Sequence, residues 1–212
     1  ENINFDQLEL SKLPELEQLM LHKIFVMNVK FKKYFKNYDF HNLYKELLNF
    51  CTVDLSAFYF DIRKDNLYCD TKESNKRKST IKVLNIILNS LLKWFAPILS
   101  FTTEEIYKLL FKNQKSIHLE KFLEIPKKFQ NEKVNNKWSE LIKIRNICNI
   151  SIEEKRASKE IGSSLEADLK IQLNKKFKVI TENIDFSELC ITSKAKVKYT
   201  DNVETTAITS KA

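Results

Sequence analysis

Glycine is almost absent from this chain, which has a single one, Gly162, in 212 residues. Phosphate-binding loops of the G-x-G-x-x-G or G-x-x-x-x-G-K type need several glycines, because the backbone must approach the phosphate closely. Tight hairpin turns in all-β folds rely on glycine as well. The composition therefore excludes a glycine-rich nucleotide-binding loop and argues against an all-β fold.

Metal-binding cysteine pairs and long apolar runs are missing too. The four cysteines are scattered without C-x-x-C spacing, so neither a zinc site nor a disulfide framework is indicated, and reduced thiols in a cytoplasmic protein are favoured. The stretch "VLNIILNSLLKWFAPILSF" is interrupted by polar residues and Pro97, so no membrane span is predicted. The chain begins with Glu1 and no leader precedes the first helix, and we expect a soluble fragment of a longer protein.

The charge is of one predominant sign. A formal net charge of +8 and a pI near 9.1 suggest an anionic partner such as nucleic acid. Most of the basic residues are lysines in a chain that is also rich in Asn, Ile and Phe, a bias that composition alone can produce. A nucleic-acid surface and a merely solvated basic surface therefore both stay open.

Apolar residues recur every three or four positions over the first half of the chain, which is typical of amphipathic helices. The first helix carries Leu13, Leu16, Met20, Ile24, Met27, Phe31 and Tyr34. Asp39 and Asp54 are predicted to cap two further helices. A fourth helix has its predicted stripe at Ile81, Leu84, Leu88, Leu91 and Phe95 and is stopped by Pro97. A capping box in "TTEE", with Thr102 as the cap, opens a fifth.

The pattern changes in the second half. Residues 112–133 lose the helical period, a long helix carries Val134 to Ile152, and Gly162 is predicted as its left-handed C-terminal cap. "LEADLKIQL" then alternates as a half-buried strand, and "LCITSKAKVKY" offers a second one. The prediction is a mainly α chain. It has a helical bundle at 1–111, a crossing segment and long helix packed on the bundle at 112–162, a small α+β junction at 163–199, and a linker or tail at 200–212.

No self-contained active site is recognisable. His22, His41 and His118 lie far apart without a neighbouring acid or nucleophile, so structural or surface histidines are favoured over a triad or metal site. Arg145 falls within the apolar stripe of the last long helix and needs a carboxylate or carbonyl partner if it is buried, an ion pair being favoured. We predict no catalytic residue and no metal ligand in this chain.

One helix has two faces that both carry large side chains. In "DLSAFYFDIRKDNLYCD", Leu55, Tyr59 and Ile62 gather on one side at about 100° per residue. Phe60, Lys64 and Leu67 gather on another side, with Arg63 and Tyr68 flanking them. A face of aromatic and cationic groups suits stacking on unpaired bases and pairing with phosphates. The alternative is a central helix that is buried on two sides, with Lys64 extending to solvent.

A basic run, "SNKRKS", begins the following helix and places Lys76, Arg77 and Lys78 in its first turn. Helix N-termini attract anions, and cations at the same place strengthen that preference. A phosphate contact and a solvated charge run are both consistent with this segment.

Five segments, taken in order, resemble the C-terminal anticodon-binding region of bacterial-type isoleucyl-tRNA synthetases, a class I family. The segments are "LPEL", "YDFHNLYKELLNFC", "DLSAFYFDIRKDNLYCD", "WFAPILSFTTEEIY" and "WSELIKIR…EEKRASKEIGSSLEADL". The HIGH and KMSKS signatures of that family's catalytic domain are absent. The pairing of "FYFDIRKDNLY" with "IGSSLEA" is similar to the isoleucine enzyme rather than to its valine, leucine or methionine relatives.

The resemblance implies a domain that binds the anticodon arm of isoleucine tRNA for a parent ligase that uses ATP and Mg²⁺ in a separate catalytic domain. It also implies a cytoplasmic, monomeric enzyme without a membrane anchor, and a zinc module in the parent is left open. Lys64 matches the lysine of the family's K-D-R-L-Y segment and is implied to face RNA, with Phe60, Arg63, Arg77 and Lys78 as candidates by proximity. Asn66 replaces the arginine of that segment. A helical protein-interaction module with merely compositional basicity is the alternative.

Overall fold

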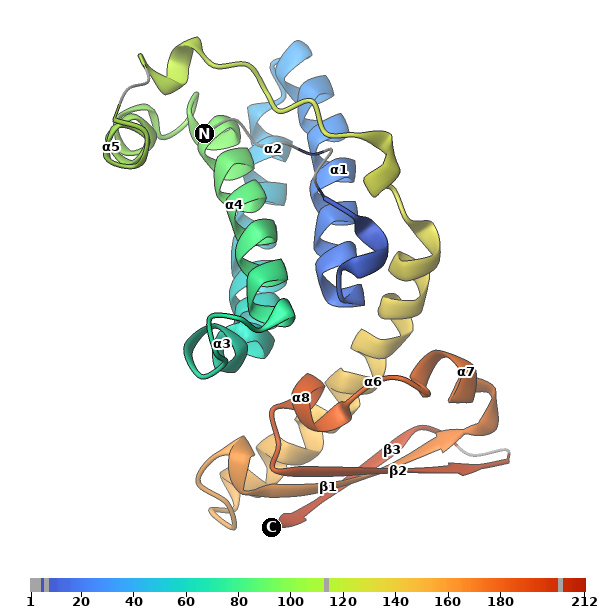
Figure 1. The fold of residues 1–212 in the computed structure, drawn as a ribbon. Helices are drawn as coiled ribbons and strands as arrows, with labels where there is room; N and C mark the ends of the chain where they lie inside the picture. Colours follow the sequence, from blue (N-terminus) through green and yellow to red (C-terminus); the bar gives the residue numbers. More distant parts are fainter. Residues whose placement is uncertain (1–4, 6–7, 113–114, 202–203) are drawn as a thin grey trace. The chain divides into compact units, whose positions relative to one another are not determined.

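The computed structural model describes residues 5, 8–112, 115–201 and 204–212 (Figure 1). Most of these residues are helical and one small sheet follows the helices, so the predicted mainly α class with a small α+β part is confirmed. The chain forms two compact units, Glu1–Val134 and Asn135–Ala212. This division falls near the start of the last long helix, whereas the sequence suggested boundaries at 111 and 162. That the long helix packs on the bundle stays a prediction.

Helix α1 (Glu15–Lys36) is the centre of the first unit and follows a short 3₁₀ turn, η2 (Leu10–Lys12). The predicted stripe is confirmed, since Leu16, Met20, Ile24, Met27 and Phe31 are all buried. Helices α2 and α4 contact α1. Burial extends beyond the apolar stripe to polar residues on other sides of α1, among them Glu17, His22 and Asn28.

A continuous helical stretch follows, made of α2 (Phe40–Asn49), the π-helical segment η3 (Phe50–Phe60) and α3 (Asp61–Tyr68). Asp39 caps α2 as predicted, because its side chain accepts a hydrogen bond from the backbone N–H of Asn42. The predicted cap at Asp54 is wrong, since the helix does not begin again there. The Asp54 carboxylate instead binds Lys23 Nζ of α1 at 2.8 Å. π-helical segments such as η3 are rare and often occur at functional sites.

Helix α4 (Asn75–Phe95) begins with Ser74 as its N-cap and ends before Pro97, as expected. The predicted apolar stripe is not its most buried face, because Ile81 is exposed and the other members are only half-buried. The buried face carries Thr80, Val83, Ile87, Ser90 and Trp94. Small hydroxyl side chains such as Thr80 allow close packing, and their hydroxyl groups form hydrogen bonds inside the unit. Counting apolar residues alone therefore predicts the wrong buried face for α4.

Helix α5 (Ser100–Leu110) corrects the predicted capping box, because it begins before Thr102. Glu104 binds outside the helix start instead, accepting hydrogen bonds from Ser116 Oγ at 2.8 Å and from the N–H of Ile117 at 3.0 Å. Bonds from Lys108 and Ser116 lower the pKa of Glu104 to about 2. Between α5 and the last long helix, the residues that the structure describes are irregular apart from two 3₁₀ turns, η4 (Ile117–Leu119) and η5 (Lys127–Phe129).

The long helix α6 (Glu132–Ala157) ends earlier than predicted. Its left-handed residue is Lys159, with φ 60°, and Gly162 has no positive φ. The glycine matters for a different reason. Its N–H donates to Glu166 Oε2 at 3.2 Å, and a Cβ at this position would lie 3.1 Å from Glu166 Oε1. Arg145 is buried, and its Nε donates to the carbonyl of Leu189 at 2.8 Å, one of the two kinds of partner that the sequence allowed. That an ion pair also holds it stays a prediction.

The second unit contains a three-stranded sheet with strand order β2-β1-β3. Strand β1 (Ala167–Asn174) pairs in parallel with β2 (Lys194–Thr200), which confirms both predicted strands. The predicted tail is wrong, because β3 (Thr206–Lys211) pairs antiparallel with β1; residues 202–203 of that tail lie outside the described residues. A strand at a sheet edge is held by backbone hydrogen bonds and needs no apolar face of its own.

Short elements connect β1 to the rest of this unit. The turn η6 (Ser164–Glu166) precedes β1, and η7 (Lys175–Phe177), α7 (Lys178–Thr181) and α8 (Phe186–Cys190) lead from β1 to β2. Alternate residues of β1 are buried on one face of the sheet: Ala167, Leu169, Ile171 and Leu173. On that face Ser151 of α6 bonds Thr209 of β3, and α8 contacts β2.

Candidate nucleic-acid interface

The helical stretch that ends in α3 has one buried and one exposed side. Tyr59, Ile62 and Arg63 are buried, whereas Phe60, Lys64 and Tyr68 follow one another at steps of four residues on the exposed side. The exposed fraction is 42% for Phe60, 47% for the Lys64 side chain and 87% for Tyr68. Residues four apart are neighbours on a helix surface. We call these three residues the exposed row; two-sided burial of this helix is not what the structure shows.

The buried side is held by a carboxylate that the sequence gave little reason to single out. Glu17 of α1 is fully buried and binds Arg63 through both oxygens, at 2.7 Å from Nε and 2.7 Å from Nη2. Tyr59 Oη donates to the same carboxylate at 3.3 Å and Thr80 Oγ1 at 2.9 Å. Burial raises the pKa of Tyr59, helped by the Glu17 charge, so the phenol stays protonated and donates. These four residues form the Glu17 cluster.

Arg63 was expected to face RNA by proximity, and the structure corrects that expectation. Arg63 is 3% exposed, and Nε and Nη2 of its guanidinium bind Glu17, so a phosphate in solution does not meet it. Breaking a buried ion pair leaves an unpaired buried charge, which costs several kcal/mol. Arg63 therefore fixes the helical stretch to α1 and α4. The signal in the sequence was Glu17 itself, an acid directly next to Leu16 on the predicted core helix.

Lys64 has the opposite environment. Its Nζ lies 2.9 Å from Asp61 Oδ1, and both side chains are more than a third exposed. Exposed ion pairs of this kind contribute about 0–1 kcal/mol, so a phosphate can replace the carboxylate at little cost. Phe60 and Tyr68 lie one turn before and one turn after. The sequence placed Tyr68 at the flank of this face without choosing it, and its exposure makes it part of the row.

The two basic candidates on α4 differ from each other. Arg77 is half-buried, and its Nε donates to Leu67 O at 3.0 Å, which joins the first turn of α4 to the last turn of α3. Lys78 is exposed, and its Nζ lies 2.8 Å from Glu73 Oε2. The Lys78 side chain is therefore accessible to a ligand in solvent, whereas Arg77 forms a hydrogen bond that holds α3 and α4 together.

Asn66, where the resembled family commonly has arginine, faces inward rather than toward the exposed row. Its Oδ1 accepts from Arg63 Nη1 at 3.5 Å, and its Nδ2 donates to Asp70 Oδ2 at 3.4 Å. Asp70 Oδ2 also accepts from Ser74 Oγ at 2.9 Å, next to the start of α4. The asparagine thus links the Glu17 cluster to the turn between α3 and α4, and the loss of an arginine does not remove charge from the row.

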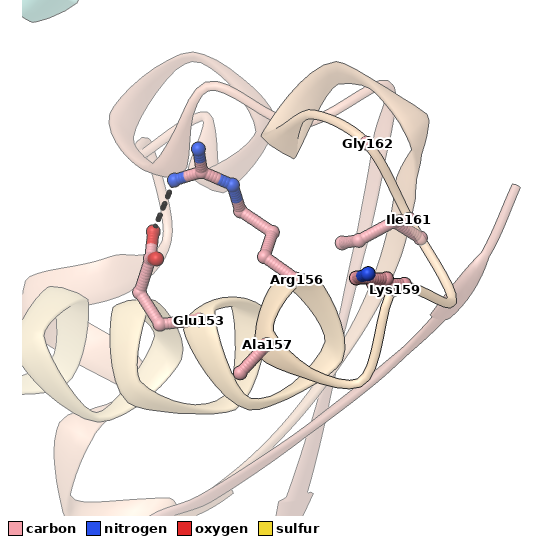
Figure 2. Close-up of a pocket in the computed structure, with 6 residues that line it drawn as sticks. All are labelled: Glu153, Arg156, Ala157, Lys159, Ile161 and Gly162. Atoms are coloured by element: carbon pink, nitrogen blue, oxygen red, sulfur yellow. Dashed lines mark hydrogen bonds and ion pairs between the residues drawn. The ribbon is translucent and has the colours of Figure 1, made fainter.

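A shallow pocket of about 450 Å³ lies at the C-terminal end of α6 (Figure 2). Figure 2 shows Arg156 and Glu153 pointing toward each other across it, and they form an ion pair of 2.7 Å. A helix C-terminus carries partial negative charge, so this pocket does not favour an anion. Its lining offers no nucleophile paired with a base.

Other kinds of site find no support among the described residues. No group of three or more His, Cys, Asp or Glu side chains there is placed to hold a metal ion. Within the same residues, no helix has the length and apolar character that crossing a membrane requires. Of the three histidines, His22 is buried and accepts the Asn131 N–H at Nδ1 over 3.0 Å, while His41 and His118 are exposed.

An exposed aromatic and cationic row on a helical bundle suits a helical domain that binds nucleic acid. Comparison with protein families identifies the class, since the model described as "Anticodon-binding domain of tRNA ligase" matches residues 17–173. The chain belongs to that family. The match runs from the Glu17 cluster through α6 to the end of β1, and β2 and β3 lie beyond it.

Individual relatives point to one kind of tRNA ligase. The chain is 65% identical over 212 residues to an isoleucine–tRNA ligase of Pelagibacter ubique (strain HTCC1062), which covers 100% of this chain and 23% of that protein. It is 38% identical over 189 residues to that of Bartonella henselae, covering 89% and 20%. The enzyme of Agrobacterium fabrum is 38% identical over 191 residues, covering 90% and 20%. The chain thus spans about a fifth to a quarter of the length of these relatives.

Proposed function

We propose that this chain binds the anticodon arm of isoleucine tRNA, and that it does so as a domain of an isoleucine–tRNA ligase. The observation that carries the proposal is the exposed row on a helix of a family that binds anticodons. Phe60 and Tyr68 offer aromatic faces for unpaired bases, and Lys64 between them offers a cation for a phosphate. Lys78 is a further candidate on α4. These assignments rest on exposure and chemistry.

The fixed position of the row supports the same proposal. Glu17, Arg63, Tyr59 and Thr80 join α1, the helical stretch and α4 by side-chain bonds that are fully enclosed. A binding surface on a helix that is locked in this way is pre-organised, so that little ordering entropy is lost when RNA binds. The domain would supply binding energy and identity discrimination at a distance from the reaction.

We further propose that the whole enzyme ligates isoleucine to its tRNA in the cytoplasm, as a monomer without a membrane partner. ATP and Mg²⁺ would bind in its catalytic domain, as the resemblance to isoleucyl-tRNA synthetases implies. We expect that catalytic domain to be a further partner of this domain within the same protein.

The proposal is tested by equilibrium binding of the 212-residue chain to isoleucine tRNA, to a non-cognate tRNA, and to isoleucine tRNA with an exchanged anticodon. The exchange should weaken binding by about tenfold or more, equivalent to ~1.4 kcal/mol. Affinity should fall steeply with salt, because phosphate contacts release counterions. Equal affinity for all three RNAs would contradict anticodon recognition. Binding of a protein partner that is indifferent to salt, with no RNA binding, would favour the protein-interaction alternative.

A further inference from the structure

The outer face of the sheet in the second unit carries an unusual concentration of lysine. Strand β2 alternates, with Lys194, Lys196 and Lys198 exposed and the residues between them half-buried. On the central strand, the exposed Lys170 lies on the same face, because it is the register partner of Lys196. Residues paired across parallel strands project to the same side of the sheet. We call these four residues the lysine face.

Little on this side of the sheet balances the charge. The other residues of β1 on it are Asp168 and Gln172, which pair in register with Lys194 and Lys198. Strand β3 contributes only the uncharged Thr206, Ile208 and Ser210. Among the residues that the structure describes, none of these four lysines has an ion-pair or hydrogen-bond partner at its Nζ. Four lysines therefore stand against one aspartate.

The placement of these lysines lowers the stability of the free protein. Lys170 and Lys196 are direct neighbours across two strands, and like charges directly opposite each other destabilise a sheet. Lysine on an edge strand can protect against aggregation, and β2 is an edge strand. That purpose does not explain Lys170 on the central strand, nor the uncharged outer side of the other edge strand, β3. The charge follows neighbouring strands rather than the edges.

We propose that the lysine face is a second RNA contact, which binds phosphates of the tRNA backbone. Lysines at alternate positions of β2 recur about every 6.6 Å along the strand, which forms a linear row of cations for a polyanion. Contacts of this kind are independent of base sequence and dependent on salt. The three lysines of β2 also lie beyond residue 173, where the family match ends. The inference rests on the proposed tRNA binding and extends it to the second unit.

The test is to change the lysine face to glutamine in the 212-residue chain and to measure isoleucine tRNA affinity over a range of salt. The variant Lys170→Gln, Lys194→Gln, Lys196→Gln, Lys198→Gln should bind at least about tenfold more weakly near 0.1 M salt. The slope of log affinity against log salt should become shallower by about two to four. The loss should be equal for cognate and non-cognate tRNA, because backbone contacts do not read sequence.

A matched control removes the same charge from other surfaces of the same unit. It carries glutamine at Lys143, Lys155, Lys175 and Lys178, and it should keep most of the wild-type affinity. A second variant with arginine at the four positions of the lysine face should bind like wild type. If the fourfold glutamine variant is unfolded by circular dichroism, the double variant Lys194→Gln, Lys198→Gln should show about half of the change in slope.

The outcomes separate this inference from the proposed function. If the wild-type chain binds isoleucine tRNA and the glutamine variant binds it equally well, the lysine face is not an RNA contact. The proposal of anticodon binding is unaffected by that result. A chain that binds no tRNA would overturn both. Two further results would overturn this inference alone. One is aggregation of the variant with unchanged RNA affinity, which would assign the lysines to edge protection. The other is a glutamine variant that loses affinity for phosphatidylserine vesicles while it keeps its affinity for tRNA.

Discussion

Arg63 and Lys64 are adjacent basic residues on the same helix, yet their environments are opposite. Arg63 is enclosed and its guanidinium is bound by both oxygens of Glu17, whereas Lys64 is exposed and shares a single contact with Asp61. The Arg63–Glu17 pair is enclosed away from water, whereas the Lys64–Asp61 pair is open to it. A helix turns by about 100° per residue, so neighbours in the sequence fall on different sides.

The difference teaches how one positive charge is committed to the fold while the next stays available to a ligand. A buried charge with one fixed partner cannot exchange that partner without a large penalty, so it positions structure. An exposed charge loses little when it changes partners, so it is available to an anion. Exposure and the number of bonds, rather than the residue type, separate the two roles on α3.

The largest effect should come from removing the buried charge. Arg63→Ala leaves Glu17 buried and unpaired, so we expect the first unit to lose about 3–5 kcal/mol of unfolding free energy. Urea denaturation followed through Trp94, which is buried in that unit, measures the loss. The paired replacement Glu17→Leu with Arg63→Met should recover much of it, because no charge remains unpaired. A loss below about 1 kcal/mol for Arg63→Ala would contradict the comparison.

Lys64→Ala should act on binding and spare the fold. Its unfolding free energy should change by less than about 0.5 kcal/mol, because the residue is exposed and weakly paired. Isoleucine tRNA affinity should fall by about 1–3 kcal/mol, with a salt slope shallower by about one if the contact is a phosphate. Lys143→Ala is the matched control, since Lys143 has a similar exposed partner, Glu140, three residues earlier. Unchanged affinity for Lys64→Ala at low salt would remove Lys64 from the interface.

Phe60→Ala tests whether the row stacks on bases. If an unpaired base rests on the ring, affinity should fall by about 1–3 kcal/mol while Phe60→Tyr keeps it, because both rings offer an aromatic face. Phe60 is partly buried, so circular dichroism and urea denaturation must accompany the binding measurement. A stability loss that accounts for the whole binding defect would assign Phe60 to the core instead.

His22 extends the comparison to a buried base, whose Nε2 lies 4.0 Å from the exposed carboxylate of Glu132. Burial lowers the pKa of His22 below its ordinary value of 6.5, and its neutral Nδ1 accepts the Asn131 N–H. Below pH 6.5 the unfolded chain binds a proton that the folded chain resists, so stability should fall as the pH drops from 7 toward the folded pKa. Urea midpoints at pH 7.5 and 5.5 measure this. His22→Gln should lose less between the two values than wild type.

Much of the architecture was predictable because it follows from local periodicity. The long apolar stripe of α1, the Asp39 cap and the alternation in β1 each depend on residues close in the sequence. The failures share a cause. Asp54 has the chemistry of a cap, but Lys23 of another helix binds it, and the Thr80 hydroxyl is buried because it donates to Glu17, 63 residues away.

In the candidate site too, local periodicity was predictable and the partners from distant segments were not. Phe60, Lys64 and Tyr68 are four residues apart, so their common face was visible from helical geometry alone. The sequence placed Lys64 on the second face and Arg63 at its flank, yet both were candidate RNA contacts, since both are cations on one helix. The partner that separates them, Glu17, lies 46 residues away.

The sequence by itself determined the helical class, the first two strands, the resemblance to an anticodon-binding domain and the row that faces away from the core. These follow from side-chain periods and from motif order along the chain. Only the tertiary structure decided which charges are buried, that Lys159 rather than Gly162 takes the left-handed conformation, and that residues 206–211 form a strand. The buried charges and the third strand depend on bonds between distant segments, so their free energies of pairing and burial are set by neighbours that the local sequence does not specify.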